Sequence, residues 1–369
     1  MTVAQGLERV LGHLAELVAC DTRNPPRRIT GSDPVFRYLG ARLEVAGFDV
    51  ALSDHGGGSV TLHARRGAPR LLWNFHLDTV PAPGEWSGPP LALRIAGERA
   101  IGRGACDVKG AAACALAAAE ETAGPVALLF TSDEEGGLPR CVAAFLDQLK
   151  PGRCDGVIVA EPTGGRAITG HRGIATASGE FRGVAGHGSS PRALRDNALH
   201  AAVHWAEKAI ALAETEESRA VGGLGGIRFN LGVLEGGEKP NMIAERARVR
   251  FGVRPRPGED PQEWLARLTA LAGKPERVAW TPSFVGPPLP APGRSPELAE
   301  SLAANLGIPL GDPVDFWTEA SLFSAAGLPS VVFGPGDIAQ AHAVEEWVAL
   351  PALESALSVY RRAFSGVVQ

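Results

Sequence analysis

A repeated pattern of apolar runs, each ending in a carboxylate or an imidazole, constrains the fold of this chain most strongly. Short runs typical of buried strands cover residues 71–75, 126–130, 157–160 and 330–333, and they are followed by His76, by Glu134 and Glu135, by Glu161, and, after a Gly-Pro-Gly loop, by His342. Helical patterns alternate with the first three runs, which favours a layered α/β sheet. Open α/β sheets gather their functional side chains beyond the carboxyl ends of strands. We therefore expect these side chains to converge on one site.

Taken singly, each of these side chains also has an ordinary structural interpretation. Residues 76 and 78 share one face of an extended strand, so the carboxylate of Asp78 can accept a hydrogen bond from the ring nitrogen of His76 that holds no metal. The alternative is a capped strand end with a surface carboxylate. Glu134 and Glu135 can divide their roles, with one binding a metal and the other moving a proton, but adjacent acidic residues are commonly a solvated turn.

Two further carboxylates are equally ambiguous when each is considered alone. Asp107 precedes an alanine-rich helix that is expected to begin near residue 108, where it could simply cap the helix. Glu161 precedes Pro162, which restricts it to an extended or turn conformation without requiring a ligand. Only the joint occurrence of so many metal-binding residue types suggests a metal site.

Composition excludes several classes of function. The chain has 369 residues, 45% hydrophobic and 21% charged, with a net charge of −5, which is typical of one large or two ordinary globular domains. It has no basic block, so we expect no nucleic-acid partner. Its five cysteines are scattered, as in a reduced cytoplasmic protein. Residues 7–18 have helical spacing rather than the pattern of a signal peptide, and the apolar run 111–119 is too short to cross a bilayer, so we expect no membrane association.

The middle of the chain follows a different order of elements. We expect a strand, a helix, two strands, a helix and a strand over residues 174–184, 195–215, 227–234, 242–253, 261–271 and 277–284. This is the split βαβ arrangement of ferredoxin-like domains. A Pro/Gly-rich segment over 286–294 is interpreted as the return linker, after which the α/β pattern resumes.

The motifs, in their order along the chain, resemble one family of two-metal amidohydrolases and peptidases. The residues that carry the resemblance are His76-Leu77-Asp78-Thr79-Val80-Pro81, Gly102-Arg103-Gly104 with Asp107-Val108-Lys109-Gly110, Asp133-Glu134-Glu135, Ala160-Glu161-Pro162 and Ala341-His342. The family contains acetylornithine deacetylase, succinyl-diaminopimelate desuccinylase, aminoacylase and carboxypeptidase G. The resemblance implies a zinc-aminopeptidase-like mixed sheet flanked by helices, formed by residues 1–172 and 286–369. It also implies an inserted ferredoxin-like βαββαβ lid and dimerisation domain over 173–285.

The resemblance also implies a ligand set for two divalent metal ions, zinc or cobalt. Asp107 is expected to bridge them, with His76 and Glu161 completing one metal's ligands and Glu135 and His342 the other's. The peptide bond that follows Asp107 is expected to be cis.

Catalytic roles follow from the same resemblance. Glu134 is expected to be the general base and acid that works with a metal-activated water, and Asp78 to support His76. His187, in the inserted domain of a homodimer, is expected to stabilise the oxyanion, in dimeric members at the neighbouring subunit's site.

The substrate is implied less narrowly. The stretches around residues 76–86 and 333–342 look closest to deacetylases of N-acetylornithine or N-acetylcitrulline in arginine biosynthesis. Asn241 and Arg254 match positions that grip the α-carboxylate, and Glu319 is a candidate for the side-chain end of the substrate. Alternatives are a desuccinylase, dipeptidase or carboxypeptidase of the same family and, less consistent with an intact ligand set, a non-catalytic binding member.

Overall fold

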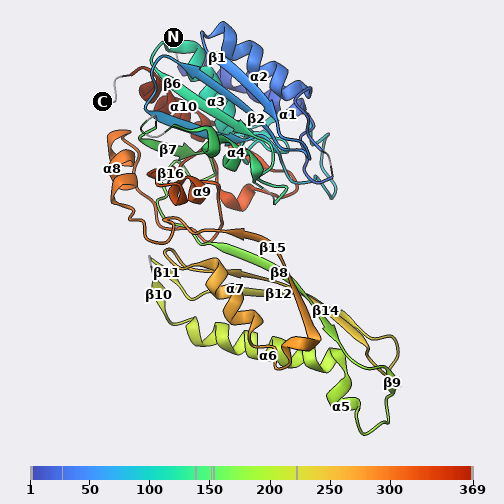
Figure 1. Cartoon of the computed structure of the whole chain (residues 1–369). Coiled ribbons are helices and arrows are strands. Elements are labelled where there is room, and N and C mark those ends of the chain that lie inside the picture. Colours follow the sequence, from blue (N-terminus) through green and yellow to red (C-terminus); the bar gives the residue numbers. More distant parts are fainter. Residues whose placement is uncertain are drawn as a thin grey trace. The chain divides into compact units, whose positions relative to one another are not determined.

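The chain folds into two compact units. The computed structural model describes residues 3–366 apart from residues 27, 138, 151, 153 and 222 (Figure 1). The first unit comprises Met1–Thr169, Ser295–Asp312 and Thr318–Gln369, and the second comprises Gly170–Arg294 and Pro313–Trp317. Residues 313–317 join the second unit because the buried guanidinium of Arg172 binds Asp315 at 2.5 Å, a contact that the sequence pattern does not reveal.

A six-stranded mixed sheet forms the centre of the first unit. Its strand order is β1 (Asp49–Asp54), β2 (Val60–Arg66), β6 (Val126–Thr131), β3 (Leu71–His76), β7 (Gly156–Val159) and β16 (Ser330–Val332). The strands β6, β3, β7 and β16 are parallel to their neighbours in this series, whereas β2 is antiparallel to both β1 and β6. The predicted mixed α/β sheet is therefore confirmed, and the carboxyl ends of four parallel strands meet at one edge.

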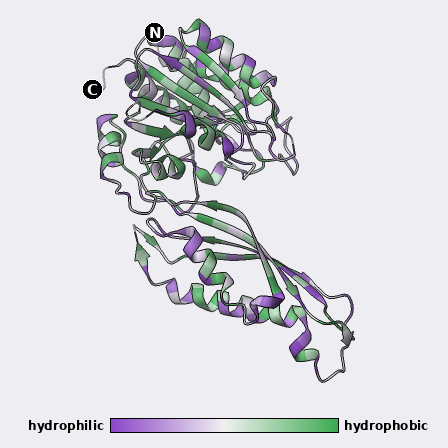
Figure 2. Cartoon of the chain, viewed as in Figure 1, coloured by the Kyte–Doolittle hydropathy of each residue, from purple (hydrophilic) through white to green (hydrophobic). Residues whose placement is uncertain are grey.

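Two layers of helices cover this sheet. One contains α1 (Val3–Ala19), α2 (Pro34–Val45), α3 (Lys109–Glu121), α8 (Glu297–Asn305) and α10 (Leu350–Phe364), and the other contains α4 (Arg140–Gln148) and α9 (Ala320–Ala325). The alanine side chains of α3 are buried along the helix, and small side chains allow α1 and α10 to approach it closely. Figure 2 shows hydrophobic residues along the central strands of this unit.

Side chains alternate between the two faces of a strand, so one face of β3 carries aromatic residues and the other carries polar residues. Trp73 and Phe75 point to the α10 layer, where their ring centroids lie 5.1 Å and 6.1 Å from that of Tyr360. Asn74 points to the opposite face and donates a hydrogen bond to Glu319, directly before α9. His76, two residues after Asn74, shares its face. His76, a predicted metal ligand, therefore lies on the side of the sheet that faces α4 and α9.

A smaller three-stranded sheet completes the first unit. It consists of β17 (Trp347–Ala349), β5 (Arg99–Ile101) and β4 (Arg94–Ala96), in that order. Its strands are too short to produce a clear alternation in the sequence, and we did not predict them.

The second unit is built on a four-stranded antiparallel sheet. The strand order is β12 (Arg228–Gly236), β14 (Arg246–Arg254), β8 (Ile174–Arg182) and β15 (Val278–Gly286). The helices α6 (Ala198–Glu216) and α7 (Pro261–Thr269) pack on it around Trp205, which is 1% exposed. Shorter elements are α5 (Ala193–Asp196) and the paired strands β9 (Gly186–His187) with β13 (Met242–Ile243) and β10 (Ala220–Val221) with β11 (Leu224–Gly225).

Within the described residues, no helix combines the length and the apolar character that crossing a bilayer requires.

An ion-pair cluster at Glu120 ties three helices of the first unit together and provides a test of the fold. Its carboxylate accepts hydrogen bonds from Arg9 at 3.1 Å and Arg42 at 2.7 Å, and it lies 3.3 Å from Nε2 of His13. Burial alone would raise the pKa of Glu120, but the bond with His13 and the bonds with Arg42 and Arg9 lower it from 4.5 to about 2.

Glu120→Gln is therefore expected to alter the acid limb of the stability curve. A carboxylate whose pKa is lower in the folded state contributes stability above its unfolded pKa, and the contribution is lost as the pH falls. The variant should be less stable at pH 7, and its free energy of unfolding should approach that of the wild type as the pH falls from 4.5 towards about 2. Urea unfolding over this range measures the difference, and a difference that is independent of pH would contradict the assignment.

Candidate metal centre

The edge where the parallel strands end brings the predicted ligand residues together. His76 is the last residue of β3, Glu135 follows β6, Glu161 follows β7, and His342 follows β16 after a loop. Asp107 lies two residues before α3 and faces the same place. Within the described residues, ligand atoms fall into two groups whose members all lie within 4.8 Å of one another: His76, Asp107 and Glu161, and Asp107, Glu135 and His342.

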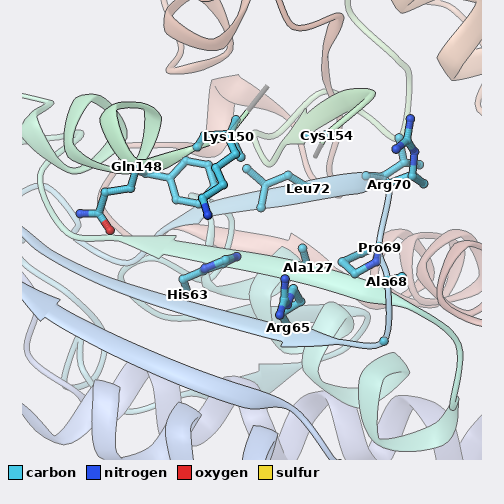
Figure 3. A pocket seen from close by; sticks show the side chains of 14 residues that line it. His63, Arg65, Ala68, Pro69, Arg70, Leu72, Ala127, Gln148, Lys150 and Cys154 are labelled. Atoms are coloured by element: carbon cyan, nitrogen blue, oxygen red, sulfur yellow. The ribbon is translucent and has the colours of Figure 1, made fainter. Parts of the chain in front are cut away.

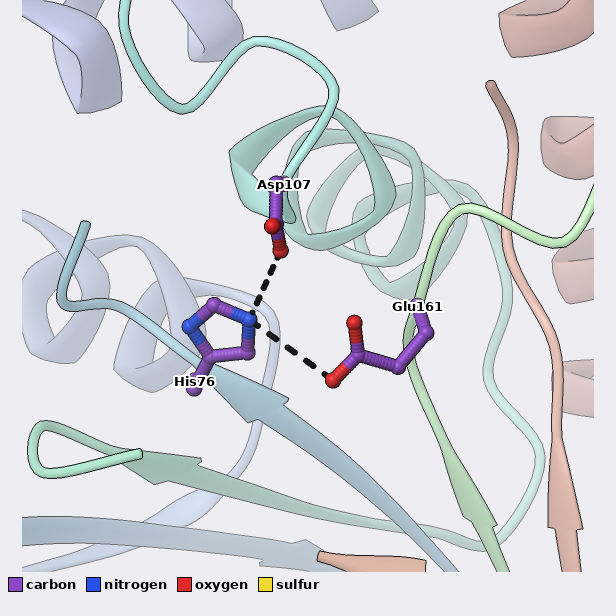
Figure 4. Close-up of side chains that lie close together, drawn as sticks. All are labelled: His76, Asp107 and Glu161. Carbon is purple, nitrogen blue, oxygen red and sulfur yellow. Dashed lines mark hydrogen bonds and ion pairs between the residues drawn. The ribbon is translucent and has the colours of Figure 1, made fainter. Parts of the chain in front are cut away.

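The first group is almost entirely buried. Nε2 of His76 lies 3.0 Å from Oδ1 of Asp107 and 3.8 Å from Oε1 of Glu161 (Figure 4). The side chains of these residues are only 2%, 7% and 6% exposed. Three converging donor atoms in a dry environment make a compact coordination site.

The second group shares Asp107 through its other carboxylate oxygen. Nε2 of His342 lies 3.3 Å from Oδ2 of Asp107 and 2.8 Å from Oε1 of Glu135. The imidazole of His342 is 54% exposed, so this group opens to solvent. Because Oδ1 and Oδ2 face different histidines, Asp107 has the orientation that a bridging ligand needs. The peptide bond that follows it is cis, which confirms that prediction.

Electrostatics in this cluster favour a cation. Burial raises the pKa of Glu161 well above its usual value, and the charge of Asp107 raises it further. Burial also raises the pKa of Glu135, against the opposing hydrogen bond with His342. Carboxylates crowded in a buried site are what bound divalent cations would neutralise, and imidazole nitrogen with carboxylate oxygen suits zinc and related metals. The residues present therefore fit two divalent metal ions.

Glu134 differs from these ligand residues in its surroundings. Among the described residues, its carboxylate has no hydrogen-bond partner, and it belongs to neither ligand group. Burial raises the pKa of Glu134 well above its usual value, because the attraction of His76 does not offset burial and the repulsion of Glu135. A carboxylate beside two metal positions, unused as a ligand, is suited to moving a proton.

Asp78 is buried beneath this site, but its contacts differ from those we expected. Nδ1 of His76 lies 3.0 Å from the backbone carbonyl of Asp78, whereas the carboxylate oxygen lies at 3.7 Å, beyond hydrogen-bonding distance. The carboxylate instead accepts from the backbone N–H groups of Glu134 at 3.3 Å and Glu135 at 3.0 Å. Asp78 thus orients the ring of His76 through its main chain and holds the Glu134–Glu135 turn through its side chain.

Asn24 is a supporting residue that sequence reasoning missed. Its amide donates to Oδ2 of Asp78 at 3.1 Å and to the carbonyl of Ser132 at 3.2 Å. It lies in an Asn-Pro-Pro segment, which indicates only a turn, and its partners are 54 and 108 residues away. No local pattern could have identified it.

Glu319, predicted to meet the substrate, is enclosed within the first unit. Its side chain is 1% exposed and accepts from Asn74 at 2.7 Å and Thr131 at 3.1 Å. Burial, together with the charge of Asp133, raises its pKa to about 8. Both hydrogen bonds go to Oε2, whereas Oε1 is buried without a hydrogen-bond partner among the described residues, so the contacts link Glu319 to the sheet and its role towards a substrate stays a prediction.

The remaining predicted site residues belong to the second unit. His187 is exposed in β9, opposite Met242 of β13, and its Nδ1 lies 2.7 Å from Oγ of Ser189. The carbonyl of Asn241 accepts from the N–H of Gly188 at 2.7 Å, so His187 and Asn241 are neighbours. Arg254 ends β14 and is partly exposed.

A cavity of about 520 Å³ lies elsewhere in the first unit (Figure 3). Its lining includes His63, Arg65, Leu72, Ala127 and Gln148. Leu72 lies near the start of β3, whereas His76 ends that strand. The cavity and the ligand residues are therefore at opposite ends of β3.

Comparison with known proteins agrees with this geometry. A family model described as peptidase family M20/M25/M40 matches residues 72–365. The chain is 46% identical over 365 residues to N-acetyl-L-citrulline deacetylase of Xanthomonas campestris pv. campestris, covering 98% of each sequence. It is 32% identical over 373 residues to acetylornithine deacetylase of Myxococcus xanthus, covering 95% of each. The solved structure of aminopeptidase PepT from Bacillus cereus has a TM-score of 0.74 at 16% identity, covering 98% of this chain and 99% of that one, a likeness of fold.

Proposed function

The chain belongs to the peptidase family M20/M25/M40, and we propose that it is a metal-dependent deacetylase whose preferred substrate is N-acetylcitrulline. The observation that carries the proposal is the 46% identity with an N-acetyl-L-citrulline deacetylase over 98% of both sequences. The intact pair of ligand groups supports hydrolysis rather than mere binding. We place the reaction in arginine biosynthesis.

The ligand groups would hold two divalent cations, which we propose to be zinc, with cobalt able to replace it. His76 and Glu161 would hold one, Glu135 and His342 the other, and Asp107 both. When bound, such metals polarise an amide carbonyl and lower the pKa of a coordinated water.

Proton transfer is assigned to Glu134. As water oxygen attacks the acetyl carbonyl carbon, Glu134 takes the proton that the water loses. When the carbon–nitrogen bond breaks, Glu134 returns that proton to the leaving amine. The second proton of the water passes from the new carboxyl group to the amine, so the products are acetate and the amino acid with a protonated amine. Asp78 keeps Glu134 in place through the two backbone N–H groups of the turn.

We propose that the second unit is a ferredoxin-like lid and dimerisation domain. Its main elements run strand, helix, strand, strand, helix, strand, which supports that fold. His187 would stabilise the oxyanion, and Asn241 and Arg254 would grip the substrate's α-carboxylate.

The spacing within the second unit supports a homodimer. Asn241 and His187 lie near the start of β14, at Arg246, whereas Arg254 ends it. Eight residues of strand span about 26 Å at ~3.3 Å per residue, which is longer than one acylated amino acid. The residues at the two ends of β14 would therefore contact different substrate molecules. His187 with Asn241 would act in the site of the partner subunit.

The side-chain end of the substrate favours a neutral group. N-acetylornithine ends in an ammonium group, which needs a carboxylate partner, whereas the ureido group of N-acetylcitrulline needs only neutral donors and acceptors. Glu319, the candidate carboxylate, already binds Asn74 and Thr131 and is buried. Its burial, with Oε2 already bonded within the fold, supports the citrulline derivative.

A substrate panel tests the proposal. Protein loaded with zinc or with cobalt is expected to release acetate from N-acetylcitrulline with a kcat/KM at least about tenfold above that for N-acetylornithine. N-succinyl-diaminopimelate and a dipeptide complete the panel, and Glu134→Gln protein controls for contaminating hydrolases. Turnover of the succinyl compound or the dipeptide alone would replace the proposed function with another of the same family.

A further inference from the structure

The buried carboxylate of Glu346 accepts four hydrogen bonds from the loop that carries Asp107. Its Oε2 accepts from the guanidinium of Arg103 at 2.7 Å and the N–H of Gly104 at 2.9 Å. Its Oε1 accepts from the N–H groups of Cys106 at 2.9 Å and Asp107 at 3.0 Å. Glu346 is 1% exposed, so water does not compete for these bonds. The main chain around the shared ligand is thus fixed by one side chain.

Glu346 also anchors the segment that carries His342. It follows His342 by four positions, and its carbonyl oxygen accepts from the N–H of Gly102 at 2.9 Å. His342 has a φ of 61°, in the left-handed region that non-glycine residues rarely occupy. Its imidazole is 54% exposed, so packing does not hold it. The conformation of His342 therefore depends on anchors elsewhere in its segment.

We propose that Glu346 is the positioning residue that sets Asp107 and His342 at the separation required for both to hold one metal. This inference rests on the proposed function, because it assumes that the two ligand groups bind metals. The positioning role does not depend on which substrate is cleaved, because it consists of one carboxylate that ties the loop over residues 103–107 to the segment over 342–346. Groups that orient metal ligands typically contribute 10–100-fold to metal affinity.

The substitution Glu346→Gln tests this positioning role, because it preserves the shape of the side chain and removes one hydrogen-bond acceptor. An amide has only one oxygen, so its NH₂ group must face either Arg103 with Gly104 or Cys106 with Asp107. Both sides present donors, and a donor facing a donor forms no hydrogen bond. The loop around Asp107 should therefore shift while the side-chain volume stays constant.

Arg103 complicates this test, because its guanidinium is 1% exposed and Glu346 is its ion-pair partner. A buried cation left without its partner destabilises a protein strongly. A double variant, Arg103→Met with Glu346→Gln, removes both charges. Arg103→Met alone keeps Glu346 and its three bonds to backbone N–H groups.

The experiment is calorimetric titration of metal-free protein with zinc, with thermal unfolding of the metal-free forms as a check on folding. Wild type and Arg103→Met are expected to bind two zinc ions per chain. In Glu346→Gln and in the double variant, the more weakly bound of the two zinc ions is expected to bind about 10–100-fold less tightly. Glu346→Asp, which keeps both oxygens, should recover part of the loss. The d–d absorption of cobalt-loaded protein should change in the same variants.

Glu345→Gln is the matched control. Glu345 is the adjacent carboxylate, and it binds Ser87 and Arg94 rather than the loop of Asp107. The Glu345→Gln protein should bind two zinc ions with wild-type affinity. If the double variant folds and binds both ions as tightly as Arg103→Met, the role assigned to Glu346 is wrong. A wild-type protein that binds two ions but cleaves no acetyl substrate would overturn the proposed function and leave this inference standing.

Discussion

Replacing Glu134 by glutamine is expected to lower kcat for N-acetylcitrulline by about 10²–10⁴-fold, the usual contribution of general acid–base catalysis. Glutamine has nearly the same shape but cannot take a proton from the attacking water. Because Glu134 belongs to neither ligand group, two metal ions should remain bound. Steady-state kinetics and metal analysis of the same preparation measure both effects.

The neighbouring carboxylate provides the matched control for this variant. Glu135 lies 2.8 Å from Nε2 of His342 and belongs to the second ligand group. Glu135→Gln should therefore reduce metal binding, whereas Glu134→Gln should not. The assignment of Glu134 fails if its variant keeps more than about a tenth of the wild-type kcat, since that loss is smaller than a general base supplies.

Asp107→Asn should abolish activity by a different route, the loss of metal. The two carboxylate oxygens of Asp107 face His76 and His342 separately, and asparagine would present an NH₂ group to one of them. We expect metal affinity to fall by more than the ~10–100-fold typical of residues that only support a ligand. Titration of the metal-free variant with zinc measures the loss directly.

A buried aspartate outside the ligand groups controls for the loss of charge. Asp133 is 3% exposed and accepts from the N–H groups of Arg140 and Cys141 through a single oxygen, a role that asparagine can keep. Asp133→Asn should therefore bind two metals. Retention of both metals by Asp107→Asn would show that this carboxylate bridges nothing.

The main elements of the fold were predictable where the chain is strongly patterned. The apolar runs at β3, β6, β7 and β16 are buried on both faces, so they appear as continuous hydrophobic segments. β1 was missed because an edge strand exposed along most of its length has no such pattern. α9 has six residues, fewer than two helical turns, and cannot establish a period.

The predicted strand over 242–253 shows how a local pattern can mislead. The structure divides it into β13, which pairs with β9, and β14, which pairs with β12 and β8. Both pieces are extended, so their side chains alternate alike, and the break at residues 244–245 and the change of partner strand leave no clear signal in the sequence.

The candidate site was predictable in its residue types and not in its supports. Acid and imidazole side chains at strand ends imply convergence, because parallel strands end at the same edge. The contacts of Asn24 and Glu346 depend on how distant loops close, with partners more than 50 and more than 200 residues away. Likewise, the carboxylate of Asp78 turned out to hold the Glu134–Glu135 turn, because backbone N–H groups compete for the same acceptor.

The two ligand groups come from different parts of the chain, so they can form at different times during synthesis. His76, Asp107 and Glu161 all precede the second unit, whereas His342 follows it. During synthesis, the first coordination site can therefore be complete before the ribosome has translated the second unit. The other site must wait until the chain has returned to the first unit. Because metal binding adds to folding free energy, the early site can stabilise a partly made sheet.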